Sequence, residues 1–166
     1  WVNAGGPDTG AALVAVGAYG RGELSPGSDI DVYLLHDPKV KVAELAERIW
    51  YPIWDEGVKL GHAVRSVKET LALAADDLDT ATAILSVRHL AGDPRLSEEL
   101  ATKGLELWKK RSKRWLDEMD VRVRARHDES DEVAFLLEPD LKNGRGGLRD
   151  VHAIGWAEAA DIALLP

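Results

Sequence analysis

Apolar runs alternate with polar loops over the first 70 residues, in the pattern typical of a small α+β core. Runs at about residues 12–17, 30–35 and 58–65 predict three strands. The stretch at about 40–52, between the second and third runs, has the longer apolar spacing of a helix. This half of the chain therefore predicts a small mixed sheet with helices.

The pattern after residue 70 is helical. Helices are expected in four further stretches, at about 67–75, 80–90, 96–127 (bent near Gly104) and 148–164. We therefore predict an α+β protein with two parts, a core at 1–70 and a helical domain at 71–166.

Two acids follow the polar loop that joins the first two predicted strands. Asp29 and Asp31 stand where the second strand begins. Residues two apart in a strand point to the same face, so the two carboxylates should project side by side. Like charges held this close repel unless a cation lies between them. Carboxylates suit Mg²⁺, and the pair therefore predicts a divalent metal site.

The loop before the acids carries groups that bind phosphate. Gly17 and two further glycines let the backbone approach a ligand. The side chains of Arg21, Ser25 and Ser28 can bind phosphate oxygens. A glycine-rich loop before a strand also occurs in ordinary hairpins, but the acids in register with Ser28 favour a site for a metal and a nucleoside triphosphate.

A strand ending in glycine, a polar loop and Asp-x-Asp in the next strand is similar to the signature of the DNA polymerase β nucleotidyltransferase superfamily. Three longer blocks resemble the N-terminal region of the bifunctional uridylyltransferase/uridylyl-removing enzymes, which modify the PII nitrogen-regulatory protein. The blocks are residues 17–31, 54–65 and 137–150. Asp-x-Asp alone is a weak signal, whereas three blocks in the family's order, spanning nearly the whole chain, are specific.

The resemblance implies a reaction and its participants. Two Mg²⁺ ions would bridge Asp29, Asp31 and the triphosphate, one activating the attacking hydroxyl and the other stabilising the departing pyrophosphate. The implied donor is UTP, or ATP as in some relatives, and the implied acceptor is a tyrosine hydroxyl of PII. A cytoplasmic enzyme of nitrogen regulation is expected, and nothing in the sequence identifies the base.

Superfamily members usually have a third carboxylate on a later strand, but the predicted strand at 59–65 contains no acid. Asp55 and Glu56 stand just before this strand and are candidates for the role. His62 is a candidate base or hydrogen-bond partner, and Arg65 a candidate phosphate ligand. A single residue of either kind is more often structural.

The loop departs from the superfamily pattern at Ala18, where glycine or serine is usual. If this position needs a positive φ, alanine would carry roughly 1 kcal/mol or more of strain. Alanine at this position removes no metal ligand.

The block at 137–150 is rich in glycine and carries the cations Lys142, Arg145 and Arg149. Its loop either closes over the nucleotide or caps the last helix, and the sequence leaves both open. Nearby, His127 and Asp128 are similar to the core of an HD phosphohydrolase, but the further ligands of such a site are not found.

Composition narrows the function classes. A net charge of −8 argues against general nucleic-acid binding, although five cations occupy the six positions 109–114. The absence of cysteine fits a reducing compartment, and neither a membrane-spanning stretch nor a signal peptide is visible. Because the chain starts at Trp1 and its one methionine is Met119, we expect a fragment. The family's phosphohydrolase and glutamine-sensing domains would then lie beyond Pro166.

Three functions stay open at this point. The first is a PII nucleotidyltransferase, the second a polymerase β-type transferase with another acceptor, and the third a non-catalytic nucleotide-binding relative. The block at 137–150 favours the first over the second. Ala18 and the missing third acid favour the third, whereas the retained pair of repelling carboxylates speaks against it.

Overall fold

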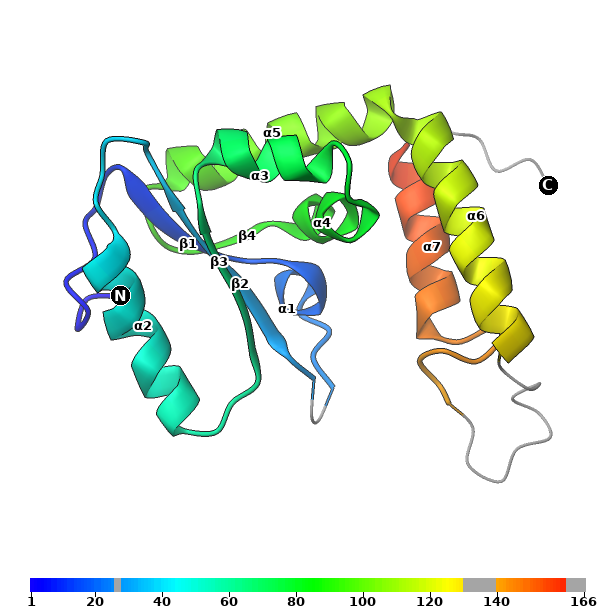
Figure 1. Cartoon of the computed structure of the whole chain (residues 1–166), viewed down its shortest axis with the longest axis horizontal. Helices are drawn as coiled ribbons and strands as arrows, with labels where there is room; N and C mark the ends of the chain where they lie inside the picture. Colours follow the sequence, from blue (N-terminus) through cyan, green and yellow to red (C-terminus); the bar gives the residue numbers. More distant parts are fainter. Residues whose placement is uncertain (26–27, 130–139, 161–166) are drawn as a thin grey trace. The chain divides into compact units, whose positions relative to one another are not determined.

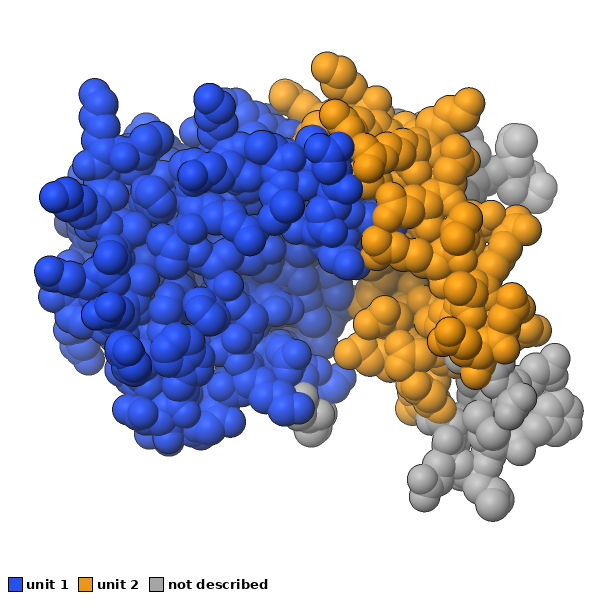
Figure 2. All heavy atoms as spheres, in the orientation of Figure 1, with its two compact units in different colours: residues 1–105 blue, residues 106–166 orange. Residues whose placement is uncertain are grey.

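The computed structural model describes residues 1–25, 28–129 and 140–160, and the chain forms two compact units (Figure 1). The units are Trp1–Leu105 and Glu106–Pro166 (Figure 2). The chain returns to the sheet after residue 70, so the helices around that return belong to the first unit. The division at residue 70 into a nucleotidyltransferase core and a helical domain stays a prediction.

A four-stranded mixed sheet forms the centre of the first unit, in the order β3-β2-β1-β4. The strands are β1 (Ala11–Ala15), β2 (Ile30–His36), β3 (Leu60–Arg65) and β4 (Arg88–Gly92). β1 runs antiparallel to both β2 and β4, whereas β3 runs parallel to β2. The three predicted strands and the α+β class are confirmed.

The fourth strand corrects the helix expected at 80–90. The chain there forms α4 (Leu78–Ala83), a 3-10 turn η1 (Ile84–Ser86) and then β4. Residues of β4 pair with β1, as Ala15 does with Arg88. The apolar spacing alone favoured a continuing helix, but hydrogen bonding to a strand more than 70 residues away decides the outcome.

One face of the sheet is covered by α2 (Ala43–Asp55) (Figure 1). Buried residues of this helix, among them Trp50, belong to one apolar cluster with Val32 and Leu34 of β2. Successive strand residues point to opposite faces, so Asp31 points away from α2. Burial of Val32 and Leu34 against α2 therefore places the Asp31 side chain on the opposite face of the sheet.

Two further helices of the first unit follow β3 closely. Helix α3 (Val67–Ala74) begins with a capping box, in which the Ser66 side chain accepts the Glu69 N–H and the Glu69 carboxylate accepts the Ser66 N–H at 2.8 Å. Because Ser66 directly follows Arg65, β3 ends where this cap begins. Helix α4 is capped by Asp77, whose carboxylate accepts the Thr80 N–H.

The predicted helix at 96–127 is two helices, α5 (Pro94–Lys110) and α6 (Ser112–Glu129). The break lies at Arg111 and not at Gly104, which corrects the expected bend. Gly104 packs closely against Ile84, because a Cβ at this position would lie 3.1 Å from the Ile84 Cδ1. In the described part of the chain, no helix is long and apolar enough to cross a membrane.

Tryptophans pack together in the second unit, which contains α6 and α7 (Leu148–Ala159). The rings of Trp108 and Trp115 stack with centroids 6.2 Å apart and planes 8° apart. The Trp108 indole N–H donates to the backbone oxygen of Trp156 at 2.9 Å. These contacts join the end of α5 to α6 and α7.

Asp150, in the first turn of α7, is the polar centre of the second unit. Its carboxylate accepts the Gly146 N–H at 2.7 Å, contacts the His127 Nε2 at 2.9 Å and pairs with Arg126. Burial alone would raise the pKa of Asp150, but these hydrogen bonds and the charge of Arg126 lower the pKa below its ordinary value. The glycine-rich loop is thus tied to α6 and caps the last helix.

We expect Asp150→Asn to lower the melting temperature at pH 7. We also expect the melting temperature of this variant to fall less steeply than that of the unsubstituted chain as the pH is lowered. A carboxyl whose folded pKa is depressed stabilises the fold above its unfolded pKa of about 4. That contribution is lost as the pH falls through the lower folded pKa. Thermal unfolding from pH 7 to pH 3 measures both effects, with the exposed Asp128→Asn as the matched control. Identical acid profiles for Asp150→Asn and the unchanged chain would contradict a stabilising role.

Candidate active site

Asp29 and Asp31, the acid pair, lie at the start of the central strand β2. Asp31 is the second residue of β2 and pairs with Gly61 of β3, while Asp29 is exposed just before the strand. Backbone hydrogen bonds fix this end of β2 on both sides, from the Val16 N–H to the Asp31 oxygen at 3.0 Å and from the Ile30 N–H to the Lys59 oxygen at 2.9 Å. The sheet therefore holds the backbone that carries the acids.

The carboxylate of Asp31 lies against two glycines. Gly17 has a φ of +57°, and a Cβ there would lie 3.2 Å from the Asp31 Oδ2. A Cβ on Gly61 would overlap the Asp31 Oδ1. Glycine at both positions leaves room for the Asp31 carboxylate, and carboxylate oxygens fit a hard divalent cation such as Mg²⁺. The importance of Gly61 was not predicted, although it directly faces Asp31 in the strand pairing.

The strain considered for Ala18 does not arise. The loop between β1 and β2 contains a short helix, α1 (Gly17–Arg21). Gly17 takes the positive φ at its start, whereas Ala18 lies within the right-handed helix. The departure from the superfamily pattern is therefore sterically harmless at the backbone.

The loop residues predicted to bind phosphate make local contacts. Ser28 bonds to Ser25, with its Oγ accepting the Ser25 N–H at 3.2 Å and its own N–H donating to the Ser25 oxygen at 2.9 Å. Residues 26 and 27 lie outside the described residues. Arg21 pairs with Glu23 at 2.7 Å. Such partly exposed ion pairs contribute little stability, so a phosphate can compete for the guanidinium.

Arg65 and Tyr33 share the sheet face with Asp31. The Arg65 guanidinium lies over the Tyr33 ring, 5.9 Å from its centroid. Burial raises the pKa of Tyr33, Arg65 lowers it, and the charges of Asp31 and Asp77 raise it further, with a raised pKa as the result. The phenol is therefore protonated at neutral pH. Sequence reasoning missed Tyr33, although the two-residue alternation from Asp29 could have found it.

The candidates for a third acid and a local base lie elsewhere. Asp55 and Glu56 are exposed at the end of α2, the helix that covers the opposite face. The His62 ring packs near Trp50 and Trp54 of the same helix, at centroid distances of 5.4 and 5.2 Å. Across residues 1–25, 28–129 and 140–160, no three acids or histidines are grouped to hold a metal. The structure thus joins none of these residues to the acid pair.

Lys142 and Arg149 are exposed in the second unit. Their backbone N–H groups bond to the Asp140 carboxylate and the Lys142 oxygen. Residues 137–139 of the same block lie outside the described residues. The contacts of this loop are those of a cap, and a nucleotide-binding role for its two cations stays a prediction.

Comparison with known proteins agrees with this geometry. The model of the nucleotidyltransferase domain family matches residues 5–81, and that of the GlnD PII-uridylyltransferase family matches residues 112–160. A bifunctional uridylyltransferase/uridylyl-removing enzyme of Streptomyces coelicolor is 46% identical over 95% of this chain and 19% of the relative. Enzymes of the same name from Mycobacterium tuberculosis and Thiobacillus denitrificans are 43% and 40% identical, over 93% and 92% of this chain and 19% and 18% of theirs.

The chain belongs to the bifunctional uridylyltransferase/uridylyl-removing enzyme family. It spans about a fifth of the length of these relatives. The matched nucleotidyltransferase domain contains the acid pair and both glycines that face Asp31. The resemblance read from the three sequence blocks is confirmed.

We expect Gly61→Ala to weaken Mg²⁺-dependent nucleotide binding about tenfold, the usual effect of disturbing a group that orients a metal ligand. The added methyl would displace the Asp31 carboxylate. Calorimetric titration of the nucleotide with and without Mg²⁺ measures the change.

The matched control is Gly155→Ala, where a Cβ meets nothing within 4 Å. Equal metal-dependent affinities for Gly61→Ala and the control would show that the Asp31 carboxylate does not hold the metal.

Proposed function

We propose that this chain transfers UMP from UTP to a tyrosine hydroxyl of the PII nitrogen-regulatory protein, with Mg²⁺ held by the acid pair. The observation that carries the proposal is the Asp31 carboxylate, held between Gly17 and Gly61 within the matched nucleotidyltransferase domain. The names of the relatives, and of the family matched at 112–160, support UTP as donor and PII as acceptor. We place the reaction in the cytoplasm and regard ATP as the competing donor.

Different residues of the chain would bind the metal and the phosphates. Asp29 and Asp31 would supply oxygen ligands, and bound Mg²⁺ would activate the hydroxyl and neutralise charge on the leaving group. The Ser28 hydroxyl accepts a backbone N–H, so its own proton is available to a phosphate oxygen. Arg21 would exchange Glu23 for a phosphate. Glycine at position 17 lets the chain approach the triphosphate.

Bond making and breaking occur at the α-phosphorus. The tyrosine oxygen of PII forms a bond to this phosphorus as its hydroxyl proton passes to solvent water. The bond from the α-phosphorus to the oxygen shared with the β-phosphorus breaks, and pyrophosphate departs. UMP is left joined to the tyrosine.

We assign only transfer to this chain, although the relatives' name also includes removal of the uridylyl group. His127, the residue similar to a phosphohydrolase ligand, has Asp150 as its partner and belongs to the helix cap. A second candidate function is nucleotide binding without transfer. It is favoured by the lack of a third acid beside the pair in the described part of the chain.

The test is transfer of label from α-labelled UTP, and in parallel α-labelled ATP, onto purified PII with Mg²⁺. We expect label on PII from UTP, reduced about a hundredfold or more by Asp31→Asn, because several kcal/mol of charge stabilisation is lost. The exposed Asp8→Asn, also in the first unit, serves as the control and should transfer normally.

Undiminished transfer by Asp31→Asn would contradict the proposed site. Metal-dependent binding of UTP without any transfer would instead favour the second candidate function.

A further inference from the structure

Helix α1 has little stability of its own. It is five residues long, has no side-chain hydrogen bond at its N-cap and buries none of its residues. Isolated helices shorter than about 12 residues are marginal in water. The position of α1, and of Gly17 at its start, therefore depends on contacts from elsewhere in the chain.

Those contacts come from Ser86 and Arg88, about 70 residues further on. The Arg88 guanidinium donates from Nη2 to the Tyr19 oxygen at 2.7 Å and from Nε to the Gly20 oxygen at 3.2 Å. The Ser86 hydroxyl lies 3.3 Å from the Gly17 oxygen and 3.1 Å from the Ala83 oxygen, and its one proton is shared between these two acceptors. Two backbone carbonyls of α1 thus accept hydrogen bonds from Arg88, and Ser86 contacts a third.

Close packing and charge reinforce the same contact. A Cβ on Gly20 would overlap the backbone oxygen of Ser86, so only glycine lets α1 lie this close to the chain before β4. The Arg88 guanidinium also lies 4.9 Å from the centroid of the Tyr19 ring. A cation at the last carbonyls of a helix is favourable, since these carry partial negative charge.

Arg88 is exposed, and its guanidinium is directed at α1 and not at an acid. Within residues 1–25, 28–129 and 140–160 it forms no ion pair with a carboxylate. An exposed arginine whose polar contacts are backbone carbonyls of one short helix is suited to fixing that helix.

We propose that Arg88, assisted by Ser86, is a positioning residue for nucleotide binding. It fixes α1 so that Gly17 stays against the Asp31 carboxylate and the loop is preformed for the triphosphate before the nucleotide arrives. A preformed loop does not have to be ordered on binding, which favours affinity. This inference rests on the proposed function, because that function supplies the nucleoside triphosphate as the ligand of the loop.

Substitution of Arg88 tests in two independent ways whether this side chain fixes α1. For Arg88→Met we expect the KM for UTP to rise about tenfold, the size of one lost charge-assisted hydrogen bond, with a much smaller change in the KM for PII. We also expect faster hydrogen exchange at residues 17–22 in the nucleotide-free chain, because α1 opens more often. A residue that only contacted phosphate would not change exchange without nucleotide.

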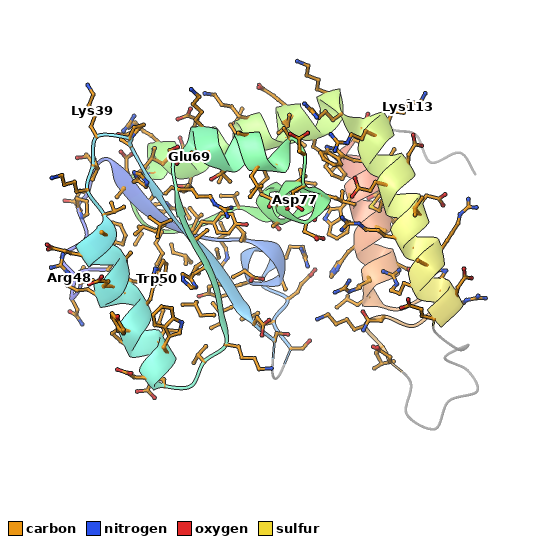
Figure 3. The ribbon with its side chains drawn as sticks, viewed as in Figure 1. Lys39, Arg48, Trp50, Glu69, Asp77 and Lys113 are labelled. Atoms are coloured by element: carbon orange, nitrogen blue, oxygen red, sulfur yellow. The ribbon has the colours of Figure 1, made fainter. Side chains whose placement is uncertain are left out.

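Two further variants sharpen the test. Arg88→Lys keeps the charge but cannot donate from two fixed nitrogens, so we expect it to restore function only in part. Arg48→Met, on the exposed side of α2, removes an arginine remote from α1 in the fold and should change neither readout (Figure 3).

The outcomes separate this inference from the proposed function. The positioning role of Arg88 would be overturned by unchanged hydrogen exchange at residues 17–22 in Arg88→Met. Full recovery of the exchange rate and of the KM for UTP in Arg88→Lys would also overturn it. If the chain without any substitution transfers no label to PII, the proposed function fails. The exchange measurement, which needs no nucleotide, still decides whether Arg88 holds α1.

Discussion

The register of strand β2 is the constraint on which the rest of the structure depends. The β2 register directs Val32 and Leu34 into the core beneath α2 and Asp31 to the other face. A slip of one residue would exchange these faces and bury a charge, at a cost that no hydrophobic gain offsets. The apolar core therefore specifies the position of Asp31.

The space around the acids is made by residues without side chains. Gly17 and Gly61 come from different elements, yet both lie against the Asp31 carboxylate. Helix α1 brings the first and strand β3 brings the second. Because α1 buries nothing, its position relies on Ser86 and Arg88, which follow α4. Segments far apart in sequence thus converge on one carboxylate.

Local pattern was sufficient to predict the first three strands, because each is encoded within a few consecutive residues. It was insufficient for β4, since Leu90 continues a helical apolar spacing and only pairing with β1 makes a strand of this segment. Gly104 was expected to bend a helix, but it makes room for Ile84.

The site shows the same division between local and tertiary information. Asp29 and Asp31 were proposed as a metal site from their spacing, which stays a prediction. The contacts of Gly61 and Arg88 were not predicted, because the partner of a glycine or an arginine is not revealed by the local sequence. His62 was considered for catalysis and packs against aromatic rings of α2. Its ring contacts depend on how α2 crosses the sheet, which no local pattern records.

The central claim is that the acid pair holds a divalent metal with a nucleoside triphosphate. A crystal structure of the chain with Mn²⁺ and a non-hydrolysable UTP analogue tests this most directly, since Mn²⁺ gives an anomalous signal. We expect an anomalous peak bound by the carboxylates of Asp29 and Asp31, with the triphosphate along the loop at 17–28. A peak at other residues, with the nucleotide bound away from the acid pair, would contradict the claim.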